Sequence, residues 1–259
     1  MKKMYLYVKV AYIGINYHGS QIQKNNKTVE GTLTEKARAI KLLNDNERIR
    51  FYSRTDKGVS STGNIFIVNT YIKPEIFLKR LNKVLNDIVC YSYATSEKKE
   101  HVVSKKYSYY LPKGECDTHK LIESAMFFVG NHDFTYFVKG HKHFQSTINS
   151  IKVKEYRDHF NIIFIAKKFE WGMIRKIVKT MQDYSSGRLA KNDILQALEG
   201  KKDIQASLAP GENLLLEDIN LGIKFHKIPV QNEYLEECIN NAKRDLFILQ
   251  KIKNKTYMD

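Results

Sequence analysis

Residues 53–59, Ser-Arg-Thr-Asp-Lys-Gly-Val, form a short polar stretch between two segments, 48–53 and 64–71, that are rich in β-branched and aromatic residues. Such flanks predict two strands joined by this loop. Asp56 lies between two basic residues, and Gly58 lets the backbone turn sharply directly after them. Nearby positive charge stabilises the ionised form of a carboxylate. Asp56 is therefore a candidate nucleophile, general base or member of a structural ion pair.

Around this loop, the first 103 residues fit the order strand, helix, strand, strand, helix, strand. Residues 4–13 alternate apolar and polar side chains with the period of a strand, and Pro74 suits the first turn of a helix. The expected elements are strand 4–13, helix 29–43, strands 48–53 and 64–71, a helix beginning at Pro74, and a strand at 88–95. This order is that of a split βαβ, or ferredoxin-like, unit.

The remaining residues repeat this order without sequence identity to the first half. The expected elements are strand 104–111, helix 118–129, strands 147–157 and 160–168, helices 169–182 and 192–199, strand 214–221 and an amphipathic helix 233–252. We therefore expect an α+β protein with two ferredoxin-like halves, 1–103 carrying the Asp56 loop and 104–259 completing the site. Their sheets would join into one continuous mixed, mainly antiparallel sheet with helices packed on one face.

The charge of the chain predicts a polyanionic partner. Its formal net charge is +15, and the excess of lysine and arginine is spread over both halves. Such a surplus indicates nucleic acid or an acidic membrane surface, although a lysine-rich composition inflates the number. A broad basic surface on folded domains suits a long duplex or a folded RNA. The 16 tyrosines favour RNA further, because related four-stranded sheets bind bases by aromatic stacking.

Features of targeting and redox chemistry predict a cytoplasmic protein without a membrane partner. No apolar run approaches the roughly 20 residues of a transmembrane helix, and the basic start lacks the uninterrupted apolar segment of a signal peptide. Cys90, Cys116 and Cys238 are far apart and have no metal-ligand spacing, which predicts reduced thiols.

A histidine-rich loop is the nearest approach to a metal site. No cysteine or carboxylate completes a tetrahedral set around His141 and His143, so no metal is expected. Together with Lys139 and Lys142 these histidines are interpreted as a loop that binds RNA phosphates. Asp133, in the same region, is interpreted as a loop or cap residue.

Six motifs follow one another in a fixed order along the chain. They are Tyr17-His18-Gly19-Ser20-Gln21 with Thr28-Val29-Glu30-Gly31-Thr32-Leu33, then Arg54-Thr55-Asp56-Lys57-Gly58-Val59, Lys106-Tyr107-Ser108-Tyr109, Gly130-Asn131-His132-Asp133-Phe134 with Phe137, Phe169-Glu170-Trp171-Gly172-Met173-Ile174-Arg175-Lys176-Ile177-Val178, and Ala209-Pro210-Gly211 before Leu214-Leu215-Leu216. Each is weak alone. In this order they resemble the tRNA pseudouridine synthase A family, in a form closer to its archaeal and eukaryotic members.

The resemblance implies an isomerase with a pseudouridine synthase fold. Such enzymes break the N1–C1′ bond of a uridine, rotate the freed uracil and rejoin it through C5, without redox change, cofactor or metal. The expected substrate is the anticodon stem-loop of tRNA, at tRNA positions 38–40. Asp56 would be the nucleophile at the ribose C1′, as in retaining glycosidases, with C6 of the uracil as the alternative target. The target uridine would first be flipped out, at a cost of about a few kcal/mol.

The resemblance also assigns roles to other residues. Tyr107 would stack on the flipped uracil and could handle the proton at C5; otherwise it is a strand aromatic of the core. Arg175 stands on an expected helix whose other residues, including Trp171, are expected in the core, and an unpaired buried charge there is costly. The resemblance implies that Arg175 pairs with the catalytic aspartate, so an Asp56–Arg175 salt bridge across the halves is predicted. Arg54 would enter the space left by the base or grip its phosphate, and is otherwise a solvated loop arginine.

Gln21, Lys139, His141 and Lys142 are the further expected substrate-binding residues. The chain differs from the family's usual residues at four positions, Ser20, Ser60, Gly172 and Lys179, which bears on the RNA contacts rather than on the reaction. The family implies a homodimer in which one tRNA contacts both subunits. The competing hypotheses are a synthase of the same fold that acts on other tRNA positions or another RNA, and a non-catalytic RNA-binding platform.

Overall fold

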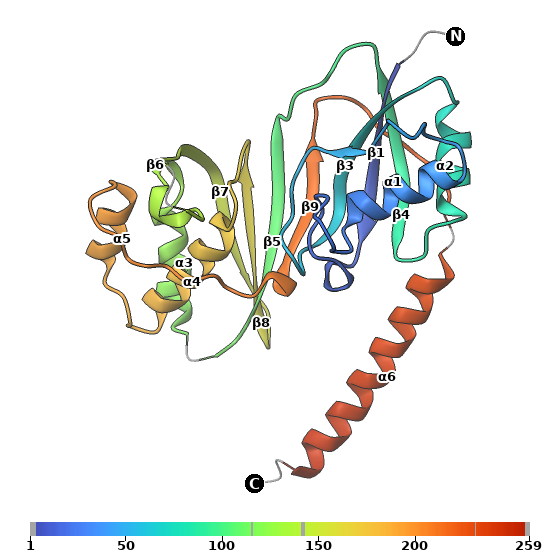
Figure 1. Cartoon of the computed structure of the whole chain (residues 1–259). Coiled ribbons are helices and arrows are strands. Elements are labelled where there is room, and N and C mark those ends of the chain that lie inside the picture. The colour runs from blue at the N-terminus through green and yellow to red at the C-terminus, as the bar shows by residue number, and fades with distance from the viewer. Residues whose placement is uncertain (1–3, 115, 141–142, 231, 257–259) are drawn as a thin grey trace.

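The computed structural model describes residues 4–114, 116–140, 143–230 and 232–256. Over these residues the chain forms one ten-stranded sheet with helices packed against it (Figure 1). The strands are β1 (Met4–Tyr12), β2 (Arg50–Phe51), β3 (Ser60–Thr70), β4 (Ile88–Ser96), β5 (Ser104–Pro112), β6 (Gly130–Asp133), β7 (Gln145–Glu155), β8 (His159–Ala166), β9 (Leu214–Asn220) and β10 (His226–Lys227). The helices are α1 (Val29–Ala39), α2 (Pro74–Asn82), α3 (Thr118–Phe127), α4 (Met173–Ser185), α5 (Lys191–Leu198) and α6 (Glu233–Thr256).

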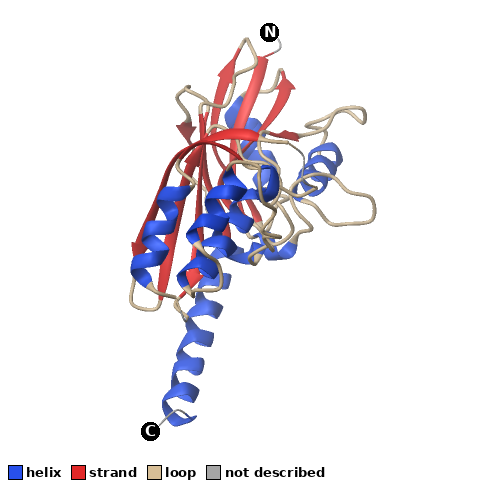
Figure 2. Cartoon of the chain, turned by 90° about the vertical axis from the view of Figure 1, so that its left-hand side faces the viewer, coloured by secondary structure: helices blue, strands red, loops and turns tan. Residues whose placement is uncertain are grey.

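Both halves arrange their four main strands in the same order. Across the sheet the order is β4-β1-β3-β2 in the first half and β9-β5-β8-β7 in the second, where β6 is added at the outer edge. Counted by appearance within each half, both read fourth, first, third, second, which is the ferredoxin-like order. The expected α+β fold with one mixed, mainly antiparallel sheet and helices on one face is therefore confirmed (Figure 2).

The halves join where β9 lies beside β3. This pairing is parallel, with Ser60 opposite Leu215 and Ser61 opposite Leu216, whereas β2 pairs with β3 farther along the strand. The Ser61 hydroxyl also donates a hydrogen bond to the carbonyl of Leu216 at 3.0 Å. Strands β2 and β9 thus share one edge of β3, and the loop that follows β2 lies at the junction. The division at residue 103 stays a prediction, because β10 returns to pair with β4 of the first half.

Helix α4 begins later than the apolar run 169–182 predicts. The run is interrupted at Gly172, whose φ of +78° precedes the first helical residue, Met173. Arg175 therefore lies in the first turn of the helix and not in its middle. The prediction that Trp171 belongs to the core is wrong, since its side chain is largely exposed.

Two hydrophobic cores hold the helices on the sheet. One core lies with α1 and α2 in the first half and includes Leu33, Phe66 and Phe77; the other lies with α3 and α4 and includes Leu121 and Ile177. Tyrosines contribute to both cores, and the buried ones are Tyr7, Tyr12, Tyr17, Tyr107 and Tyr109. The rings of these five tyrosines are packed inside the protein.

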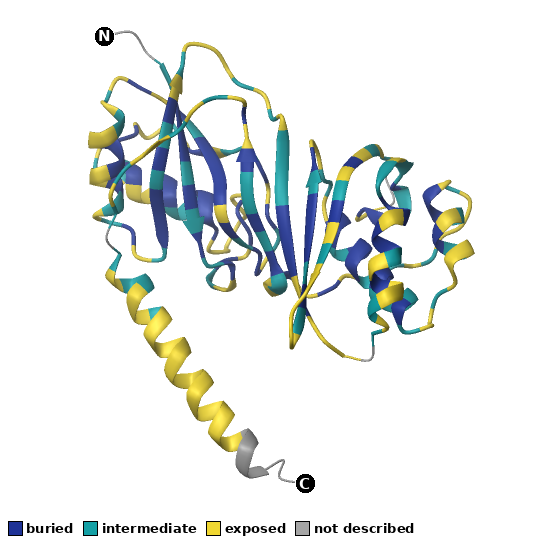
Figure 3. Ribbon diagram, turned by 180° about the vertical axis from the view of Figure 1, so that it is seen from behind, coloured by how far each residue is buried: buried dark blue, intermediate teal, exposed yellow. Residues whose placement is uncertain are grey.

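Helix α6 extends away from the sheet. Its start is attached to the first half, where the Asn16 side-chain amide donates to the Tyr234 hydroxyl at 3.4 Å and the Asn232 amide to the carbonyl of Asn86 at 3.1 Å. Beyond this attachment the side chains of residues 239–251 are exposed (Figure 3). The apolar ones among them are therefore not covered by the described part of the chain.

Candidate active site

Asp56 lies in the loop between β2 and β3, at the junction of the two halves. Gly58 has a φ of +81°, which residues with a side chain rarely adopt, and Val59 donates its backbone N–H to the carbonyl of Asp56 at 3.2 Å. The loop is therefore a tight turn, as its sequence predicts. This turn fixes the backbone from which the Asp56 carboxylate projects.

A buried serine anchors the loop from the side of β1. The Ser20 hydroxyl accepts the N–H of Thr55 at 2.8 Å, and the Ser20 N–H donates to the carbonyl of Thr55 at 3.1 Å. The hydroxyls of Tyr12 and Thr55 lie 3.0 Å apart and are also hydrogen-bonded. Ser20 is one of the four departures from the family's usual residues. Its contacts here are with the loop itself, so it supports the position of Asp56.

An ion pair between Asp56 and Arg175 connects the two halves. Arg175 donates from Nη1 to Asp56 Oδ2 at 3.0 Å and from Nε to the carbonyl of Ala209 at 2.6 Å. Both charged side chains are 17% exposed. The predicted salt bridge is therefore confirmed, and the second hydrogen bond fixes the plane of the guanidinium. Water has little access to the pair, which strengthens the attraction between the charges.

The segment that follows Ala209 closes around this pair. A Cβ atom at Gly211 would lie 2.6 Å from the carbonyl oxygen of Lys57 and 3.6 Å from Cζ of Arg175. Only glycine allows the backbone to approach both the aspartate loop and the arginine so closely. The Ala209-Pro210-Gly211 motif therefore brings a third segment of the chain to the ion pair.

Tyr107 of β5 lies beside the aspartate loop and is only 5% exposed. Its hydroxyl is hydrogen-bonded to the Ser53 hydroxyl at 2.9 Å, and its ring packs edge-on against Phe169 with centroids 5.4 Å apart. Burial raises the pKa of Tyr107 well above its ordinary value, and the charge of Asp56 adds to this effect. The phenol therefore stays protonated at neutral pH.

Lys105 belongs to the same group of side chains. It lies two residues before Tyr107 on β5, so both point to one face of the sheet. Its ammonium donates to the Ser53 hydroxyl at 2.9 Å and to the carbonyl of Tyr52 at 3.4 Å. Burial lowers the pKa of Lys105 to about 8, with the charge of Lys168 lowering it further and that of Glu170 opposing the shift. Lys105, Ser53 and Tyr107 thus form a hydrogen-bonded chain.

The other expected site residues lie around this centre. Arg54 and Gln21 are exposed. The Lys139 ammonium lies 3.7 Å from the centre of the Trp171 ring, a cation–π contact near the start of α4. His141 and Lys142 lie outside the described residues. Asp133 is the last residue of β6, and its Oδ1 accepts the N–H of Thr135 at 2.8 Å, so of the two interpretations, loop or cap residue, the contact agrees with a cap on the turn that follows the strand.

The sequence did not reveal what Ser20, Ser53 and Lys105 do in the site. Ser20 and Ser53 stand within the motifs, but a serine in a loop gives no sign of which groups its hydroxyl will contact. Lys105 could have been found from its spacing, because a residue two before Tyr107 on a strand shares its face. In the described part of the chain, no group of three or more His, Cys, Asp or Glu side chains is placed to hold a metal ion.

The sequence matches known proteins over most of its length. The family model described as tRNA pseudouridine synthase matches residues 125–220. The tRNA pseudouridine synthase A of Methanothermobacter thermautotrophicus is 34% identical over 233 residues, covering 87% of this chain and 83% of that protein. The chain belongs to the tRNA pseudouridine synthase A family. A protein of the same name from Pyrococcus horikoshii is 35% identical over 243 residues and covers 89% of both chains.

Membership of the tRNA pseudouridine synthase A family makes the chain an isomerase. Solved structures match it more weakly: a crystal structure of a Cbf5-Nop10-Gar1 complex has a TM-score of 0.35 and 13% identity, covering 67% of this chain and 43% of that chain. That similarity is too low to carry a conclusion. No helix in the described residues is long and apolar enough to span a membrane.

Proposed function

We propose that this tRNA pseudouridine synthase converts uridine to pseudouridine in the anticodon stem-loop of tRNA, in the cytoplasm, with Asp56 as its nucleophile. The observation that carries the proposal is the ion pair of Asp56 and Arg175, which are 119 residues apart in sequence and 3.0 Å apart in space. A carboxylate that is partly shielded from water and held by a guanidinium is oriented for attack on a sugar carbon.

The reaction needs no covalent partner beyond the carboxylate, and water can accept the proton from C5 and supply the one that N1 takes up. An oxygen of Asp56 bonds to C1′ while the N1–C1′ bond breaks, and the bonding pair stays on the uracil N1. The freed uracil then rotates, and its C5 attacks C1′ as the carboxylate leaves with its electron pair. Loss of the C5 proton and protonation of N1 complete the isomerisation. In the alternative, Asp56 adds first to C6 of the uracil.

Tyr107 is proposed to stack on the flipped uracil. In the structure its ring is covered by Phe169, so the base would take the place of the Phe169 ring. The hydrogen bond to Ser53 keeps the Tyr107 ring in its plane while this exchange occurs. Arg54, exposed two residues before the nucleophile, is placed to enter the space that the base leaves or to bind its phosphate.

Tritium release from transcripts labelled at uridine C5 tests the proposal. The chain should release tritium from a tRNA transcript, because C5 exchanges its proton for the bond to C1′. A matched transcript with cytidine in place of the uridines of the anticodon stem-loop should release none. Release from both transcripts would place the modified uridine elsewhere and favour the same-fold synthase. Tight binding without release from any transcript would favour a non-catalytic RNA-binding platform.

Activity is expected to fall as the pH rises through about 8. Lys105 loses its proton in this range, so the RNA backbone loses a cation beside the site. The decline should appear in kcat/KM, which reports the free enzyme, measured between about pH 6.5 and 9. The matched variant Lys105→Arg keeps its charge at every pH used and should remove the decline. A decline that is equal in both proteins would assign it to the substrate and contradict this role for Lys105.

We further propose that the chain forms a homodimer through α6. The helix carries an apolar stripe at helical spacing whose exposed members are Ile239, Leu246 and Leu249, at 45%, 57% and 61% exposure. A row of apolar side chains on a projecting helix is costly in water unless another surface covers it. A second copy of this chain is the occupant that the family resemblance favours.

Charge placed in this stripe should dissociate the dimer. In Leu246→Glu/Leu249→Glu two carboxylates replace apolar contacts, so the molar mass measured by light scattering should fall from the dimer to the monomer. The control Asn240→Glu adds a carboxylate on the polar side of the same helix and should leave the mass unchanged. A monomeric native protein, or a dimer that survives both substitutions, would show that α6 is not the interface.

A further inference from the structure

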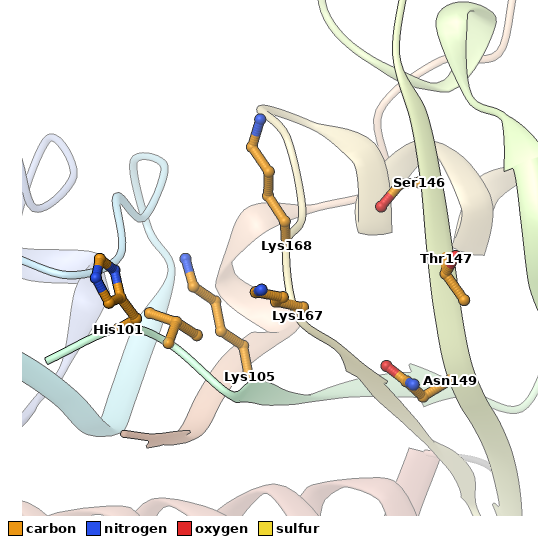
Figure 4. Close-up of a pocket in the computed structure, with 8 residues that line it drawn as sticks. His101, Lys105, Ser146, Thr147, Asn149, Lys167 and Lys168 are labelled. Carbon is orange, nitrogen blue, oxygen red and sulfur yellow. The ribbon is translucent and has the colours of Figure 1, made fainter. Parts of the chain in front are cut away.

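A hollow of about 650 Å³ lies next to the candidate active site (Figure 4). It is bordered by the start of β5, the start of β7 and the turn after β8, and its lining residues are His101, Val102, Lys105, Ser146, Thr147, Asn149, Lys167 and Lys168. Hollows of this size hold small molecules or a nucleotide-sized part of a larger ligand. Nothing in the reaction described above uses this space.

The polar groups of the hollow are those that bind anions. Three lysines contribute ammonium groups, and hydroxyl or amide side chains on β7 can donate further hydrogen bonds. Lys167 is exposed and forms no ion pair among the residues that the structure describes. Lys168 pairs with Glu170 at 2.6 Å, and this contact is exposed enough to be exchanged for another anion.

Lys105 gives the hollow an ammonium that bonds no carboxylate among the described residues. Its two acceptors, the Ser53 hydroxyl and the Tyr52 carbonyl, are both neutral, and an ammonium has three N–H donors. One donor is therefore left for a ligand. Taking a charged amine out of water costs free energy that an anion in contact with it would return. The lowered pKa of Lys105 has this same cause.

The hollow is one hydrogen-bonded step from Tyr107. Lys105 lines the hollow and donates to Ser53, and the Ser53 hydroxyl bonds the Tyr107 hydroxyl at 2.9 Å. A ligand that draws the Lys105 ammonium toward itself would therefore act on the hydrogen bonds that hold the Tyr107 ring. The position of the hollow beside Tyr107 and its positive charge together favour one kind of ligand, a part of the substrate that lies next to the target uridine.

We propose that this hollow binds a phosphodiester of the RNA strand that carries the target uridine, through Lys105, Lys167 and Lys168. The proposal rests on the proposed function, because it takes the chain's RNA substrate as the source of the phosphate. A phosphodiester suits the site better than a base, since three cations surround it and its only lining side chain that is purely apolar is Val102. RNA bound here would be held beside the nucleophile and not only by the outer basic surface.

Binding of a synthetic anticodon stem-loop RNA tests the site. In Lys167→Gln/Lys168→Gln the affinity should fall by about 10-fold or more at low salt, and the slope of log K against log salt should flatten by roughly 0.7 for each lost phosphate contact. The control Lys79→Gln removes an exposed lysine from α2, on the first half of the sheet, and should change neither quantity by more than about twofold. An unchanged slope in the double variant would overturn the proposal.

A scan of single neutral methylphosphonate linkages gives the sharper result. One or two linkages should lower the affinity of the native protein by about 10-fold and that of the double variant by clearly less, because two of the three lysines that the phosphate binds are already gone. Equal losses in the two proteins at every linkage would overturn the proposal. If Lys168→Gln unfolds the protein by releasing Glu170, Lys167→Gln alone carries the same comparison.

Tritium release separates the failure of this site from the failure of the proposed function. If the loss of affinity at one methylphosphonate linkage depends on the lysines, the phosphate site is supported, whether or not the native protein releases tritium. Absence of tritium release would then contradict the proposed reaction alone. Tritium release without such dependence overturns the site and leaves the reaction intact.

Discussion

Asp56→Asn is expected to abolish pseudouridine formation, with a fall in the single-turnover rate of at least about 10⁴-fold. An amide has the size of the carboxylate but cannot form and release an ester at C1′, so no other part of the proposed reaction can proceed. Affinity for the tRNA transcript should stay within about threefold, because the loop is held by Ser20 and Thr55, which the substitution leaves in place. Tritium release and filter binding measure the two quantities on the same preparation.

The matched control for this variant is Asp133→Asn. Asp133 is a partly buried carboxylate in the second half that accepts a hydrogen bond from Thr135 and has no arginine partner among the described residues. This variant should retain turnover within about threefold. Measurable turnover by Asp56→Asn would refute the assigned nucleophile, and loss of turnover in both variants would point to unfolding rather than to chemistry.

Arg175→Leu is expected to lower the rate at saturating RNA by about 10²–10³-fold. The substitution removes the only guanidinium that the structure shows against Asp56, so the carboxylate loses its orientation and faces apolar surroundings without a partner. Because a shielded charge without a partner is costly, stability should also fall, by about 1–3 kcal/mol. Single-turnover kinetics and urea unfolding measure the two effects.

Arg175→Lys separates charge from geometry. A lysine can supply one charge to Asp56, but it cannot also hold the carbonyl of Ala209 with a planar fork. Stability should therefore recover more than the rate does. A rate equal to that of the native protein would show that position of the guanidinium does not matter. In the double variant Arg175→Leu/Asp56→Asn the stability loss should be smaller than in Arg175→Leu, because no carboxylate is left without a partner.

The fold followed from the sequence because its signals are local. Alternation in β1, the proline at the start of α2 and the order of the elements predict two ferredoxin-like halves. The short strands β6 and β10 were missed because they have four and two residues, too few for a period to appear. The start of α4 was placed too early, since an apolar run does not reveal that Gly172 adopts a left-handed conformation.

The site was predictable where a charge demanded a partner. Arg175 among apolar residues required an acidic partner, and the resemblance to the family identified that partner as Asp56. The hydrogen-bonded chain from Lys105 through Ser53 to Tyr107 was not predictable, because it depends on the loop after β2 lying across β5. The exposure of Trp171 was not predictable either, because an apolar side chain is buried only when the turn that carries it faces the core.

The position of β9 has a consequence for how the protein is made. Residues 214–220 are synthesised after strands β1–β8, yet they occupy the middle of the sheet between β3 and β5. Before they emerge, both half-sheets expose an unpaired strand edge to each other and to other chains. Contacts between residues about 155 positions apart must then join the two half-sheets. Contacts between residues so distant in sequence form slowly during folding. Because Gly211 and Ala209 lie just ahead of β9, the ion pair of Asp56 and Arg175 should be enclosed only after this segment has been made, so that a chain truncated before it would carry Asp56 without its full surroundings.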